Sequence, residues 1–75
     1  MGRDLDAVVL EALELASLRG GLLSALTLAV PFPSAVVEGR VRRQLARAGL
    51  TDVELSLQEA SGPPRILAVE VQARP

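Results

Sequence analysis

The chain has 75 residues, with nine acidic and eight basic side chains and a formal net charge of −1. This length supports one small domain, residues 1–75, and a charge near zero gives no general attraction to nucleic acid or to a membrane surface. The absence of cysteine and histidine excludes disulfides, thiolate or imidazole metal sites and catalysis by either residue. Oxygen ligands could still hold Mg²⁺ or Ca²⁺, but no cluster with that spacing is visible, so we expect no cofactor and no metal.

The first expected element is a helix from Asp4 to Leu18. Asp4 or Asp6 can cap its first turn, and Gly20 and Gly21 follow its end, where glycine is favoured. Apolar residues recur at helical spacing and predict one buried face. This face consists of Leu5, Val8, Val9, Ala12, Leu13 and Ala16, with Leu10 and Leu18 pointing elsewhere.

A strand is expected from Leu22 to Val30. Alternation places two rows of side chains on opposite faces of the strand. One row is Leu22, Ser24, Leu26, Leu28 and Val30, and the other is Leu23, Ala25, Thr27 and Ala29. We expect the row that contains Leu26 to contact the helices. The run from 20 to 37 carries no charge, but its glycines and prolines would break a spanning helix, so we expect no membrane span.

A proline-bounded loop, Pro31-Phe32-Pro33, leads into a second helix from Ser34 to Ala48. Ser34 is a suitable N-cap, and Gly49 ends the helix. Two interpretations of the loop stay open. Either Phe32 plugs the end of the core, or the loop is a rigid contact point presented to a partner.

The second helix has an apolar face and a basic flank. Val37, Val41, Leu45 and Ala48 would face the sheet. Arg40, Arg43 and Arg47 share one flank, which is either simply solvated or a surface for an acidic partner. With the loop, these arginines complete the candidate partner-binding residues: Pro31, Phe32, Pro33, Ser34, Arg40, Arg43 and Arg47.

Two further strands are expected, at 52–57 and 65–73, joined by a turn at Ser61-Gly62-Pro63-Pro64. The inward residues would be Val53, Leu55 and Leu57 in one strand, and Leu67, Val69, Val71 and Ala73 in the other. We expect these strands to form an antiparallel hairpin. The predicted fold is α+β, a two-layer sandwich in the order α-β-α-β-β. Its three-stranded mixed sheet has the order 1-3-2, and both helices cover one face.

The stretch from Leu26 to Leu57 resembles the metal–sulfur cluster biosynthesis domain, found in PaaD- and SufT-like proteins and at the N-terminus of Mrp/ApbC-type ATPases. The similar pattern is a strand, a proline corner at 31–33, a charged helix at 37–48, and Gly49-Leu50-Thr51-Asp52-Val53-Glu54-Leu55. The resemblance implies a role in iron–sulfur cluster assembly, with an assembly ATPase or scaffold as the protein partner.

Two departures from that family matter. Aligned without gaps, Pro33 occupies the position of the family's cysteine, and the Asp-Pro-Glu segment is missing, because Gly20-Gly21 leads directly into Leu22. Such a chain would position a partner but not hold a cluster through thiolate. The outline also resembles the copper-chaperone-like heavy-metal-associated domain, whose Cys-x-x-Cys would fall at Pro31 to Ser34. Without cysteine, only the analogy of fold is left.

The expected function is a small non-enzymatic interaction or accessory domain, linked to iron–sulfur cluster assembly by docking to a protein. The alternative is a homo-oligomeric or ligand-binding module with a ferredoxin-like outline, favoured by the thin core. An enzyme is less favoured, because nothing near Glu54 and Glu70 would complete an acid–base set. Acidic residues crowd the N-terminus and no signal peptide is evident, so the expected location is the cytoplasm.

Overall fold

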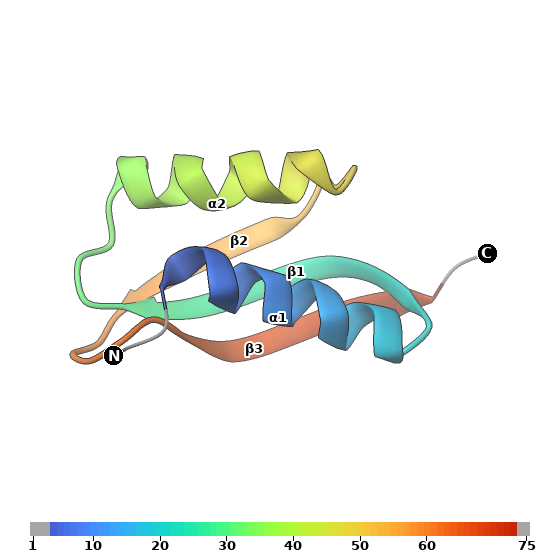
Figure 1. The fold of residues 1–75 in the computed structure, drawn as a ribbon, viewed down its shortest axis with the longest axis horizontal. Coiled ribbons are helices and arrows are strands. Elements are labelled where there is room, and N and C mark those ends of the chain that lie inside the picture. The colour runs from blue at the N-terminus through green and yellow to red at the C-terminus, as the bar shows by residue number, and fades with distance from the viewer. Residues whose placement is uncertain (1–3, 74–75) are drawn as a thin grey trace.

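The computed structural model describes residues 4–73, whose elements follow the predicted order α-β-α-β-β (Figure 1). The elements are α1 (Leu5–Leu18), β1 (Gly21–Val30), α2 (Ala35–Arg47), β2 (Glu54–Glu59) and β3 (Arg65–Ala73). Two helices and a three-stranded mixed sheet confirm the α+β class. Within this range neither helix has the length and apolarity needed to cross a membrane.

The helix ends follow their predicted caps. The Asp4 side chain accepts a hydrogen bond from the Ala7 backbone N–H at 2.8 Å, and Ser34 Oγ accepts one from Val37 at 3.2 Å. Gly20 and Gly49 follow the helices with φ of +72° and +81°, a conformation that glycine adopts at little cost. These local signals set the helix boundaries to within a residue or two.

The strand order differs from the prediction. The sheet runs β2-β1-β3, so β1 and not β3 is central, and β2 and β3 do not form a hairpin. β1 pairs with β2 in parallel and with β3 antiparallel. The predicted order 1-3-2 is therefore wrong. The physical reason is that β1 is the uncharged strand, which loses least by being enclosed on both edges.

The core forms around β1. Leu26 and Leu28 are fully buried, together with Val41 and Leu45 of α2. From α1, Val8, Val9, Ala12 and Ala16 join the same cluster, which confirms the predicted apolar face. Figure 1 shows α1 crossing in front of β1 and β3, with α2 running along the β2 side. The whole fold thus depends on one small aliphatic core without an aromatic residue.

A β-bulge in β1 reverses the predicted faces at the start of the strand. The register with β3 shifts between Leu23 and Ala25, and a bulge of one residue exchanges the two faces of a strand. Leu23 is accordingly buried, with 3% of its surface exposed, whereas Leu22 is 46% exposed. The predicted inward position of Leu22 is wrong, and that of Leu28 is confirmed.

A second bulge lies in β3, opposite the step from Thr27 to Leu28. Leu67 has no opposite residue in β1, and it is exposed, while Ile66 packs against the core. The predicted inward position of Leu67 is wrong, and Ile66, which was not among the predicted inward residues, packs against the core in its place. Beyond the bulge Val69 and Val71 pack against the core as predicted. Ala73, at the end of β3, is exposed, so its predicted inward position is wrong.

The bulge in β1 predicts opposite effects for two adjacent leucines. Leu23→Ala should lower the free energy of unfolding by about 2–5 kcal/mol, because it leaves a cavity in the core. Leu22→Ala should cost less than about 1 kcal/mol, because the side chain is half exposed. Urea denaturation followed by circular dichroism measures both. A larger loss for Leu22→Ala would contradict this register.

Replacing Gly21 or Gly39 with alanine should change the stability in opposite directions. A Cβ at Gly21 would lie 2.5 Å from the backbone oxygen of Gln72 and 2.6 Å from Val71 Cγ1, so Gly21→Ala should destabilise the fold by about 1–3 kcal/mol. Gly39 lies in the exposed part of α2, where a Cβ would meet nothing within 4 Å. Gly39→Ala should stabilise by up to about 1 kcal/mol. Thermal denaturation of the two variants tests the close approach of β1 and β3.

Candidate partner-binding site

The corner between β1 and α2 presents the only aromatic side chain of the sequence. Phe32 is 80% exposed, so the interpretation in which it plugs the core is wrong. That end of the core is instead covered by Leu5 and Val37, which pack against the buried cluster. Pro31 is half-buried, Pro33 is exposed, and Ser34 caps α2.

A shallow cavity of about 230 Å³ adjoins Phe32. It is lined mainly by apolar side chains, with one arginine at its border, and its lining consists of Leu5, Val30, Pro31, Phe32, Val37, Arg40 and Pro64. Val36, in the first turn of α2, is also 80% exposed. Sequence reasoning missed Val36. Its exposure depends on how α2 is rotated against the sheet, because adjacent helix positions such as the buried Val8 and Val9 of α1 can both face the core.

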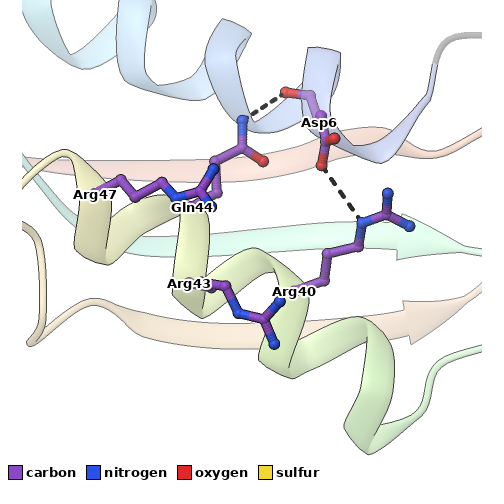
Figure 2. A pocket seen from close by; sticks show the side chains of 5 residues that line it. All are labelled: Asp6, Arg40, Arg43, Gln44 and Arg47. Carbon is purple, nitrogen blue, oxygen red and sulfur yellow. Dashed lines mark hydrogen bonds and ion pairs between the residues drawn. The ribbon is translucent and has the colours of Figure 1, made fainter.

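The three predicted arginines do come together. Arg40, Arg43 and Arg47 line a cleft of about 230 Å³ with Asp6 of α1 and Gln44 of α2 (Figure 2). Arg40 Nε lies 3.7 Å from Asp6 Oδ1, and both side chains are more than half exposed, so this pair contributes little stability. Among the described residues, the side chains of Arg43 and Arg47 form no hydrogen bond or ion pair.

Gln44 and Asp6 belong to this cleft but were not predicted there. Gln44 Nε2 donates to the Asp6 backbone oxygen at 3.1 Å (Figure 2). Gln44 Oε1 is buried and accepts no hydrogen bond within the described part of the chain. The sequence contains no signal for this contact, because Gln44 and Asp6 lie on two helices that are far apart along the chain. The cleft therefore offers cationic donors at its rim and one unsatisfied acceptor inside.

Arg42 does not line this cleft and has a structural role. It contacts Glu38 Oε1 at 3.4 Å and donates to the Val53 backbone oxygen at 3.3 Å. The second bond joins α2 to the segment just before β2. Arg40, which borders both cavities, lies on the other flank of α2.

The sheet also carries two carboxylates opposite one another. Glu54 in β2 and Glu70 in β3 both pair with Ala25 of β1. Both side chains are exposed, and two strand spacings separate their backbones by roughly 9–10 Å. Residues 4–73 contain no group of three or more acidic side chains placed to hold a metal ion.

Comparison of the chain with protein-family models, with curated proteins and with solved structures finds no match. The resemblance to the metal–sulfur cluster biosynthesis domain therefore rests on the pattern from Leu26 to Leu57. The site must be interpreted from its own chemistry.

The two kinds of arginine predict different losses of stability. Arg42→Ala removes a hydrogen bond to the Val53 carbonyl and should lower the free energy of unfolding by about 0.5–1.5 kcal/mol. Arg43→Ala removes no side-chain hydrogen bond or ion pair with a described residue, and its effect should lie within about 0.5 kcal/mol of zero. Denaturant titrations compare them, and a larger loss for Arg43→Ala would show that Arg43 supports the fold.

Proposed function

We propose that this chain is a small non-enzymatic interaction domain that docks to a protein partner. Its docking surface would be the Pro31-Phe32-Pro33 corner with Arg40, Arg43 and Arg47. The observation that carries the proposal is the 80% exposure of Phe32. Burying a phenylalanine side chain stabilises a structure by roughly 1.5–3 kcal/mol. Phe32 is exposed, so most of this free energy does not contribute to the fold. A partner that covers Phe32 would gain that free energy.

The surroundings of Phe32 support a partner with a particular chemistry. Arg40 borders both the apolar cavity at Phe32 and the cationic cleft, so the two form one continuous surface. Aromatic and arginine side chains are the residue types that dominate protein interfaces. We infer a partner segment with an apolar side chain for the cavity and neighbouring carboxylates for Arg43 and Arg47.

The link to iron–sulfur cluster assembly is part of the proposal and rests on the family resemblance. The partner would be an assembly ATPase or a scaffold, met in the cytoplasm. Because Pro33 stands at the position of the family's cysteine, the domain would position its partner and would not ligate a cluster.

We also propose that the fold is a two-layer sandwich with both helices on one face of the sheet. The support is that α1 and α2 contact each other through Gln44 and Asp6 and contribute to one cluster with Leu26 and Leu28. The opposite face would then be open, along the row containing Ala25 and Thr27.

Capture of partners from the native host tests the docking surface. The tagged chain, expressed at its natural level, is purified anaerobically beside Phe32→Ala. Leu18→Ala is the control, because Leu18 is also highly exposed but lies at the end of α1. We expect Phe32→Ala to reduce the recovered partner roughly tenfold or more and the control to have no effect.

Two outcomes separate the parts of the proposal. Equal recovery by Phe32→Ala would contradict docking through this corner. A partner that depends on Phe32 but has no role in iron–sulfur cluster assembly would support the docking surface and contradict the iron–sulfur link.

A further inference from the structure

β3 is an edge strand, and its outer backbone groups have no strand partner in residues 4–73. The order β2-β1-β3 leaves two edges, and β3 has nine residues where β2 has six. Unpaired N–H and C=O groups along an edge are a template for another strand, and proteins commonly block them with lysine, proline or β-bulges. The segment Arg65–Ala73 contains no lysine or proline, and its one bulge, at Leu67, leaves regular strand on both sides.

The side chains along β3 are only partly covered. Leu67 is 46% exposed, and Val69 and Val71 are half-buried although they pack against the core. A strand added at this edge would remove apolar surface from water and would pair backbone groups at the same time.

The charges on the two edge strands determine which of them could pair with the same strand in a second copy of the chain. β2 carries Glu54 and Glu59 and no cation, so two β2 strands would repel each other. β3 carries one charge of each sign, Arg65 and Glu70. A second copy is therefore complementary to the β3 edge and not to the β2 edge.

The bulge at Leu67 places Arg65 and Glu70 on the same face of the sheet. Through pairing with β1, Arg65, Ala68 and Glu70 lie opposite Ala29, Thr27 and Ala25. Ala25 and Thr27 are half-buried and alternate with the fully buried Leu26 and Leu28, and Ala29, although buried, lies outside the core cluster. All three β3 residues therefore face away from that cluster. With the bulge counted as one position, Ala68 is midway between the two charges.

We propose that two copies of the chain associate through β3, antiparallel about a twofold axis at Ala68, to form one continuous six-stranded sheet. In this register Arg65 of each copy lies opposite Glu70 of the second copy, so two ion pairs form. A twofold axis at Glu70 or at Arg65 would instead oppose like charges. The bulge creates the complementarity, because an unbulged strand would put the two charges on opposite faces.

Single-cysteine variants test the position of the axis, since the chain has no cysteine of its own. Directly opposite residues in an antiparallel pair have Cα atoms about 4.5–5.5 Å apart, within the range of a disulfide. Ala68→Cys should therefore form a disulfide-linked dimer under mild oxidation. Ser56→Cys is the matched control, because Ser56 flanks Thr27 on the β2 side as Ala68 does on the β3 side. Ala68→Cys should crosslink at least roughly tenfold faster.

Charge exchange tests the register. Arg65→Glu or Glu70→Arg alone opposes like charges and should raise the dimer dissociation constant roughly tenfold. The double variant should return it to within about threefold of the unmodified chain. Glu54→Arg, an equal change of charge on the β2 edge, should have no effect. Sedimentation equilibrium measures association, and circular dichroism confirms folding, because Arg65 also donates to the Ser61 backbone oxygen at 3.3 Å.

A chain that is monomeric up to millimolar concentration would overturn the proposal. A dimer that responds to Glu54→Arg, or in which both cysteine variants crosslink equally, would overturn it as well. Phe32 lies on the corner between β1 and α2, not on β3, so Phe32→Ala should leave self-association unchanged. The two proposals therefore fail independently.

Discussion

The packing of β1 against both helices is the constraint on which the other elements depend. Leu26 and Leu28 meet Val8 and Val9 from α1 and Val41 and Leu45 from α2 in one cluster. β2 and β3 then attach to the two edges of β1. With no aromatic residue in this cluster and only a few large side chains fully buried, the fold has little stability to spare. A substitution that weakens the packing of β1 would therefore destabilise every other element.

The small core also explains what is left on the surface. The helices present their polar flanks to each other across a cleft where Gln44 meets the Asp6 backbone, and the arginines extend from its rim. The proline corner holds Phe32 away from the core, whose end is covered by Leu5 and Val37. Apolar side chains thus remain exposed at Phe32 and Val36. Contiguous apolar patches on a protein surface often mark sites of interaction with a partner.

Local features of the fold were largely predictable, because they depend on residues close in sequence. Asp4 and Ser34 mark the starts of the helices, and glycines at 20 and 49 follow their ends. The arginine flank followed from helical spacing alone. The contribution of Asp6 and Gln44 to the cleft did not, because it requires α1 and α2 to pack side by side.

The sequence by itself determined the α+β class, the order of the elements and most of the apolar face of each helix. These follow from the period of the side chains and from capping chemistry, which act over a few residues. Ala48, predicted to face the sheet, is exposed at the end of α2. Only the tertiary structure decided that β1 is central and that Leu23 and Ile66, not Leu22 and Leu67, face the core. Strand order depends on which strand is best enclosed by the rest of the chain. A bulge forms only against a paired strand, so a strand considered alone has no signal for it.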